Sequence, residues 1–226
     1  NTVTRKVSAT VQDAAVYAGD FEVDADSMQG VSSFVVSAGV GGVGAGASGV
    51  VTVTKLNNTT KAALLNSTVN ANTVNVNAAH TGIVNAGNVG VGASGLGGGL
   101  GISVGVLKDD SETTVTVGTE DSTATDDKTT ITASGDVNIA AENTATVNPT
   151  ISATGVGDVA GVAGATSINN INSKVTTNIN NAEINSTGGN ISGTAKNNFN
   201  VDAYIGGNAA GAVGVGASVT VNTIDS

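Results

Sequence analysis

The densest group of chemically capable side chains in this sequence is acidic. Carboxylates crowd the stretch between Ser111 and Lys128, and clustered carboxylate oxygens are ligands that Ca²⁺ prefers. The spacing matches neither the EF-hand loop nor the glycine-aspartate repeat of calcium-binding β-rolls, so a solvated acidic loop is the favoured alternative. The candidate metal cluster is Glu120, Asp121, Asp126 and Asp127, and the candidate partner-binding loop is the same four residues with Glu112.

Histidine, serine and glycine offer weaker signals for chemistry. His80 is the only histidine and has no acidic neighbour in sequence, and the serine-rich segments lack a base, so no catalytic triad is predicted. Two segments match the GxGxxG pattern, but neither enters a helix, as a dinucleotide-binding fold would require. We interpret these glycines as positions of close backbone approach. The sequence therefore predicts no enzyme and no cofactor. The matching glycines are Gly39, Gly41 and Gly44, and Gly90, Gly92 and Gly95.

These residues lie in a repeated framework. The stretch from Gly211 to Ile224 alternates valine or alanine with glycine, serine, threonine or asparagine, which is the period-two pattern of a strand with one apolar face. Related blocks recur at intervals of 51, 64 and 53 residues, accompanied by a second motif, GDVNIAA in its fullest form. Recurrence at this spacing indicates a solenoid. The blocks close near Leu56, Leu107, Ile171 and Ile224, and the second motif contains Phe21, Val74, Val137 and Ile191.

Composition narrows the class of protein. Of 226 residues, 32 are glycine and 12% are charged, whereas about a quarter of a typical domain is charged. Small and β-branched residues suit a narrow core in which one position stacks coil after coil, and their alternation argues against disorder. A net charge of −10 argues against a nucleic-acid partner, and the absence of cysteine excludes disulfides and thiolate metal sites.

The block AGAVGVGASVTVNTI, joined to GDVNIAA, resembles the repeat region of fusobacterial leukotoxin and related giant exoproteins of the filamentous-haemagglutinin type. The resemblance covers all four units. It implies a right-handed parallel β-helix, export through an outer-membrane secretion partner (type V secretion), and a location that is secreted or on the surface of a Gram-negative bacterium. It supplies no catalytic residues. The chain begins at Asn1 without a leader, so we expect an internal fragment of a longer protein.

Pattern and resemblance together predict a single all-β domain over residues 1–226, an elongated right-handed parallel β-helix of four imperfect repeats. About 12 coils of roughly 18–20 residues are expected. The second connection is about ten residues longer than its counterparts. It is predicted to project as an acidic insertion over 109–135, a hairpin pairing 113–117 with 129–132, and to be the most exposed and protease-sensitive part of the chain. Inward positions are predicted for Val213, Val215, Val219 and Val221, and outward positions for Thr220 and Asn222.

Two functions fit these expectations. In the first, the chain is a non-enzymatic rod segment of a secreted adhesin that contacts a host cell-surface protein or glycan. In the second, it is an effector segment of a leukotoxin that acts on host membranes. The uncharged runs Gly30–Thr54 and Ala86–Leu107 could span a bilayer as helices, but glycine makes poor helices, so membrane contact is not favoured. Glycine blocks buried in the stack would be core, whereas exposed blocks would form an apolar patch for membranes or partners.

Overall fold

The computed structural model of this chain describes residues 1–120 and 128–225. Every regular element in the described part is a β-strand, as the alternating pattern predicts. The strands are β1 (Thr2–Gln12), β2 (Ala15–Tyr17), β3 (Asp20–Gly41), β4 (Gly46–Leu65), β5 (Thr68–Ala71), β6 (Thr73–Ser94), β7 (Gly98–Gly118), β8 (Thr129–Ala133), β9 (Val137–Gly157), β10 (Ala160–Asn180), β11 (Ala182–Ser186), β12 (Ile191–Val201), β13 (Tyr204–Ala210) and β14 (Val213–Asp225).

The strands form three parallel sheets, and the chain visits each sheet once per coil. Sheet A has the order β1-β4-β7-β10-β14, sheet B the order β11-β8-β5-β2, and sheet C the order β12-β9-β6-β3, with β13 also pairing with β9. Each strand pairs in parallel with its counterpart one coil away. The chain is therefore an all-β parallel β-helix, as predicted. The predicted alignment of Phe21, Val74, Val137 and Ile191 is confirmed, because these four residues stack in one column.

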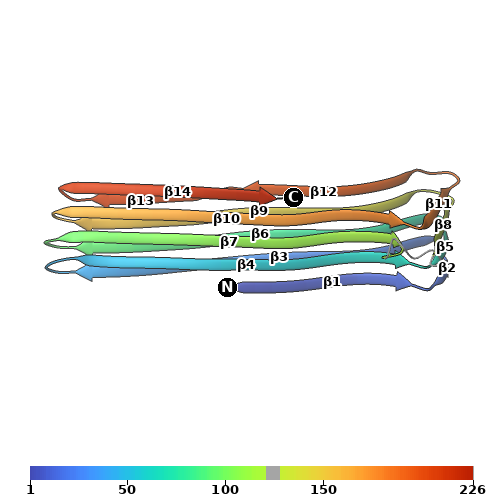
Figure 1. The fold of residues 1–226 in the computed structure, drawn as a ribbon, viewed down its shortest axis with the longest axis horizontal. Helices are drawn as coiled ribbons and strands as arrows, with labels where there is room; N and C mark the ends of the chain where they lie inside the picture. The colour runs from blue at the N-terminus through green and yellow to red at the C-terminus, as the bar shows by residue number, and fades with distance from the viewer. Residues whose placement is uncertain (121–127, 226) are drawn as a thin grey trace.

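The predicted number of coils is wrong. Phe21 pairs with Val74, 53 residues later in the chain, so one coil takes 53 residues rather than 18–20. Long strands replace the expected short ones because two broad sheets cover each other over their whole length. The molecule is elongated along its strands, as Figure 1 shows, and not along the stacking direction. Twenty-residue strands extend about 66 Å, whereas five stacked strands occupy only about 19 Å between the first and the last.

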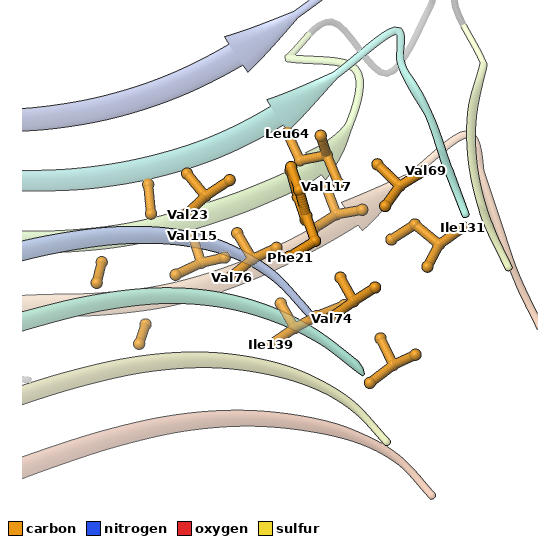
Figure 2. Close-up of a cluster of buried hydrophobic side chains, with 14 of the residues drawn as sticks. Phe21, Val23, Leu64, Val69, Val74, Val76, Val115, Val117, Ile131 and Ile139 are labelled. Carbon is orange, nitrogen blue, oxygen red and sulfur yellow. The ribbon is translucent and has the colours of Figure 1, made fainter. Parts of the chain in front are cut away.

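The largest apolar core lies next to sheet B, and two smaller clusters, one around Leu107 and Ile171 and one around Ile151, lie farther along the strands. Val74, Val76, Ile131 and Ile139 are fully buried in the core next to sheet B, and Figure 2 shows them converging from sheets B and C on residues of sheet A such as Val115. Side chains on this inner face alternate with polar residues that point to solvent. The two broad sheets A and C together form a slab. We call the part of this slab next to sheet B, together with its surface, the charged half, because it carries nearly all the charged residues of the chain.

The other end of the slab consists of residues 30–54, 86–107, 150–171 and 203–224, which we call the glycine half. Asp158 is the only charged residue in these ranges. Its two sheets approach so closely that several inner positions have no room for a side chain, although Ile151 and Val50 are buried between them elsewhere in this half. A Cβ atom at Gly92 would lie 2.0 Å from the Leu100 carbonyl oxygen, and one at Gly155 would lie 2.0 Å from that of Val162. Glycine is therefore required here, as the interpretation of close backbone approach predicted.

The predicted orientation of the last block is reversed. Val213, Val215, Val219 and Val221 are 47–60% exposed. The orientation is fixed one coil below, where the partner of Val221, Ile168, is 39% exposed while the neighbouring Asn169 is buried and bonds to Asn222. Thr220 and Asn222 therefore occupy the inner face. The physical reason is the narrow interior, which accepts glycine, alanine and small polar residues but not rows of valine.

The register of the second coil also departs from the sequence alignment. Leu56 pairs with Asp109, and Asp109 pairs with Ile171, so an aspartate occupies the level at which the other coils carry an aliphatic residue. Leu107 lies two residues earlier, on the same inner face, and is buried. The cause is visible in the spacing, because the Leu56-to-Leu107 interval is 51 residues and the coil requires 53.

Candidate functional site

The acidic insertion leaves the solenoid at the junction between sheets A and B. Glu112 lies in β7 and Glu120 just after that strand, whereas Asp121, Asp126 and Asp127 lie outside the described residues. The predicted hairpin between 113–117 and 129–132 is wrong. The first segment belongs to β7 and pairs with β4 and β10, and the second belongs to β8 and pairs with β5 and β11. Both edges of each strand are occupied by neighbouring coils, so the two segments cannot pair with each other.

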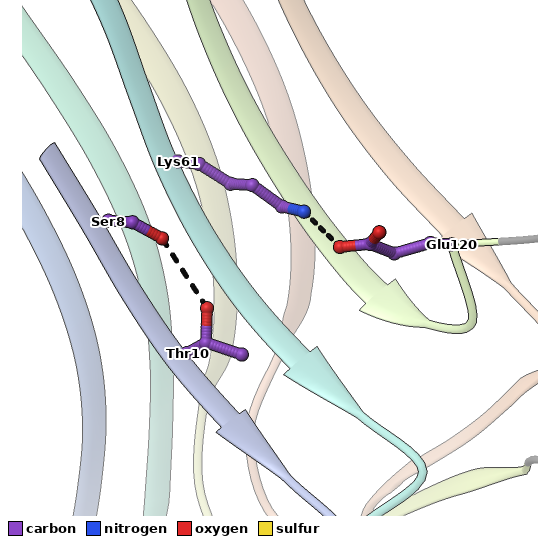
Figure 3. A network of polar contacts seen from close by, with 4 residues as sticks. All are labelled: Ser8, Thr10, Lys61 and Glu120. Atoms are coloured by element: carbon purple, nitrogen blue, oxygen red, sulfur yellow. Dashed lines mark hydrogen bonds and ion pairs between the residues drawn. The ribbon is translucent and has the colours of Figure 1, made fainter. Parts of the chain in front are cut away.

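An ion pair fixes the start of the insertion to the outer face of sheet A. The Lys61 ammonium on β4 donates a hydrogen bond to the Glu120 carboxylate, and Figure 3 shows this contact beside the Ser8–Thr10 hydroxyl pair on β1. The two side chains are 29% and 57% exposed, so the pair contributes at most about 1 kcal/mol. Three further exposed pairs have N–O distances of 2.5–3.0 Å: Lys108–Asp110, Lys128–Glu183 and Lys196–Glu142.

The described carboxylates do not converge on a metal position. No group of three or more histidine, aspartate or glutamate side chains suited to a metal ion occurs in the described ranges. Glu112 lines two neighbouring surface hollows on sheet A, where threonine and asparagine rows dominate the walls. Such hollows present hydroxyls, amides and single charges to a passing polar ligand, and they lack a base held against a nucleophile. The four-residue metal cluster stays a prediction, since three of its members are outside the described part.

The GxGxxG glycines do not form a phosphate cradle. Gly39, Gly90 and Gly92 lie within long strands on the inner face, and their backbones belong to the parallel ladders. Gly44 lies in the turn between β3 and β4 with a φ of +112°, a conformation that favours glycine. The glycines therefore serve the close approach of the sheets and a turn.

A buried polar strip separates the apolar core from the glycine half. The Ser27 hydroxyl donates to the Asn58 side-chain oxygen at 3.1 Å, and the Asn58 amide donates to Thr60 at 3.1 Å. His80 lies 3.4 Å from Ser27 through Nδ1, and burial lowers the pKa of its imidazole, with the charge of Arg5 acting in the same direction. The ring of His80 occupies a level held by Asn143 in the next coil.

Asp109 is the buried ionisable group that sequence reasoning missed. It is 3% exposed between Leu56 and Ile171, and Ser111 donates a hydrogen bond to its carboxylate at 2.6 Å. Burial raises the pKa of this carboxyl, and the neighbouring charge of Asp110 raises it further. The sequence indicated this position, because the interval from Leu56 to Leu107 is 51 residues and therefore two residues shorter than a coil.

One surface of the described structure is apolar and exposed. On sheet A in the glycine half, aliphatic side chains from four adjacent strands point outward with little polar surface between them, and Val51 is 71% exposed. We call this surface the valine face. It consists of Val51, Val53, Leu100, Ile102, Val104, Val106, Val162, Ile168, Val215, Val219 and Val221. Many glycines of the blocks, such as Gly92 and Gly155, thus lie in the interior, and the aliphatic residues at alternate positions form an exposed patch.

Comparisons with known proteins returned no relative. No family model matches the chain, and neither the curated proteins nor the solved structures contain a match. The described residues also include no helix with the length and hydrophobicity needed to cross a membrane. What this chain does must be argued from its surfaces.

Proposed function

We propose that this chain is a non-enzymatic β-helical segment of a secreted or surface-exposed bacterial adhesin, exported through an outer-membrane secretion partner, and that it contacts a protein or glycan on host cells. The observation that carries the proposal is the nature of its surfaces. Outward side chains form rows that repeat from coil to coil, such as Lys55 over Lys108 and Asn57 over Asp110. Extended repetitive faces of this kind suit contact with large surfaces rather than turnover of a small substrate.

The acidic insertion is the break in this repetition. Val74 pairs with Val137, 63 residues later, whereas the offset in the preceding coil is 53. Recognition in solenoids concentrates on such insertions, since the coils themselves are constrained by stacking. The candidate partner-binding residues of the insertion are Glu112, Glu120, Asp121, Asp126 and Asp127, and a basic or cation-bridged partner would complement them.

The test is binding of the chain to host cells and to immobilised glycans. One variant replaces residues 119–128 with a single asparagine, because Asn181 alone joins β10 to β11 in the next coil, where Asn180 pairs with Gly118 and Ala182 with Thr129. A second variant replaces 119–128 with an uncharged ten-residue linker. We expect wild type to bind, and the short variant to lose at least tenfold in affinity with an unchanged melting temperature. The uncharged variant should lose a similar amount. Unaltered binding by both variants would remove the insertion from the proposal, and wild type that binds no cell or glycan would overturn it.

A second function, action on host membranes, is favoured by the valine face. An exposed apolar surface without charge is the property expected of a membrane-active segment. Leakage of a dye from neutral and anionic liposomes at neutral pH tests this reading. Leakage by wild type that disappears on Ile102→Lys substitution would favour the toxin effector, and intact liposomes would favour the adhesin.

A further inference from the structure

The two broad faces of the slab carry opposite charge. Outward charges on the strands of sheet A comprise five lysines and three carboxylates, a net charge of +2, which Glu120 lowers to +1. Those on sheet C comprise five carboxylates and one lysine, a net charge of −4. A strongly acidic chain thus has one face that is slightly basic. The sheet A residues are Lys6, Lys55, Lys61, Lys108, Lys174, Asp110, Glu112 and Asp225, and those of sheet C are Asp20, Glu22, Asp24, Asp26, Glu142 and Lys196.

In the glycine half, apolar side chains point outward on both faces, although on sheet C they come mainly from β3 and β6, and β9 presents Thr150, Ser152 and Thr154 there. The valine face covers sheet A there, and sheet C presents a second row of outward side chains on its opposite side. Phe34 is 69% exposed and Val40 is 84% exposed. The outward apolar residues of sheet C there are Phe34, Val36, Val40, Val89, Val91 and Val156, and Ile83 lies beside Gly30 at the edge of this half.

Complementary groups lie at the same level on the two faces. The Ser27 hydroxyl bonds across the interior to Asn58, so their outward neighbours Asp26 and Thr59 are level. Lys6 pairs with Thr59 in the adjoining strand of sheet A, and therefore lies opposite Asp26 through the thickness of the slab. A second slab displaced perpendicular to its sheets, without rotation, would bring Lys6 of one copy over Asp26 of the other.

We propose that this chain stacks on further copies of itself, with the outer face of sheet A of one copy against the outer face of sheet C of the next. Charged half then meets charged half with opposite sign, and the valine face meets the apolar part of sheet C. A face of about 66 by 19 Å covers on the order of 1,200 Å² per copy. Both copies together then bury well over the roughly 1,000 Å² that a specific interface needs. The contact is heterologous and does not close, so stacks of several copies form.

Charge distinguishes this arrangement from the alternatives. Pairing two sheet A faces in the same direction sets lysine rows against lysine rows, and pairing two sheet C faces does the same with carboxylates, which costs affinity. A neutral membrane offers no counterpart to either charged face. The proposal concerns self-association and does not depend on the host contact proposed above.

The experiment is sedimentation velocity of the 226-residue chain over a range of concentrations in low and high salt. Wild type should form species larger than dimers, less readily in high salt. Ile102→Lys, in the centre of the valine face, should raise the concentration needed for assembly about tenfold. Tyr17→Lys is the matched control, because Tyr17 is 80% exposed on sheet B and away from both faces. It should assemble like wild type.

A charge exchange tests the pairing of sheet A with sheet C. Lys6→Glu and Asp26→Lys should each weaken assembly severalfold, and the double variant should regain it, because each copy then carries the exchanged charges on both faces. Circular dichroism and thermal melting confirm that each variant is folded. Monomers at all concentrations would overturn the proposal. The proposal would also be overturned if Ile102→Lys assembled at the same concentration as wild type, or if wild type formed only a closed dimer. A double variant that assembled no more readily than the single variants would overturn it as well. Binding of wild type to phosphatidylcholine vesicles in place of self-assembly would assign the valine face to membranes.

Discussion

In the charged half, the side chains between the sheets are aliphatic next to sheet B, a buried polar strip follows them, and the side chains outside are polar. In the glycine half, glycine, alanine and small polar residues fill most of the interior, Ile151 and Val50 are buried exceptions, and most of the other aliphatic side chains point to solvent. Val76 is buried in the first half, whereas Val51, on an equally regular strand, is 71% exposed in the second. The same period-two alternation supports both arrangements, and sheet spacing decides which member of each pair is inside. At the inner positions where a Cβ would meet a carbonyl of the facing sheet, as at Gly92 and Gly155, no valine can be accommodated.

The largest effect is expected from adding one methyl group inside the glycine half, which tests whether the close spacing of the sheets excludes side chains. Gly155→Ala would place a Cβ 2.0 Å from the Val162 carbonyl oxygen, which the ladders prevent from moving freely. We expect a loss of more than about 3 kcal/mol, or a melting temperature lower by roughly 10 °C. Gly164→Ala is the matched control, since an added Cβ there meets nothing within 4 Å. A control variant as damaged as Gly155→Ala would show that the spacing argument is wrong.

Truncating an aliphatic side chain should lower the unfolding free energy strongly in the charged half and hardly at all on the outer face of the glycine half. Ile139→Ala in the charged half deletes a fully buried side chain and should cost about 2–5 kcal/mol. Val51→Ala in the glycine half deletes an exposed one and should change the unfolding free energy by less than about 0.5 kcal/mol. Chemical denaturation of both variants measures the difference. Comparable losses would place Val51 in a core.

The buried carboxylate at the boundary of the two halves should reduce stability at neutral pH. Because burial raises the pKa of Asp109, ionisation costs the folded state more than the unfolded state. Asp109→Asn keeps an acceptor for Ser111 and should be more stable than wild type by about 1 kcal/mol at pH 7.5. The advantage should shrink as pH falls and Asp109 gains its proton. A variant less stable than wild type across this range would show that the carboxylate is well solvated.

The smallest expected effect concerns His80. Burial lowers its pKa, so the unfolded state binds a proton more readily than the folded state as pH falls below about 6.5. Wild type should therefore lose stability on acidification, by at most about 1.4 kcal/mol per pH unit. His80→Asn, the residue type that the next coil carries at this level, should lose less. Melting temperatures at pH 7.5 and 5.5 provide the comparison, and parallel changes in both proteins would contradict it.

The sequence allowed a parallel solenoid to be predicted, but not the length of its coils. Stacking of Phe21 on Val74 followed from motif spacing, because a recurring strand must pair with its copy. Coil length was underestimated, since alternation alone does not mark where a strand ends. The outward orientation of Val221 was missed because valine is ordinarily the buried partner of asparagine. Only the distance between the sheets reverses that preference, and this distance is a tertiary property. The burial of Asp109 was not predicted because Leu107 matches Leu56 in residue type, whereas the 53-residue spacing pairs Leu56 with Asp109.

The claim that the glycine half is inside out relative to the charged half can be tested by cysteine labelling, because the chain contains no cysteine of its own. Four single-cysteine variants on β7 replace Ile102, Ser103, Thr114 or Val115, and a maleimide reagent is applied below the concentration at which copies assemble. We predict rapid labelling at 102 and 114, and protection at 103 and 115 until denaturant is added, because Ser103 and Val115 are fully buried. Rapid labelling at 103 with protection at 102 would mean that the aliphatic residues face inward throughout, which would contradict the account.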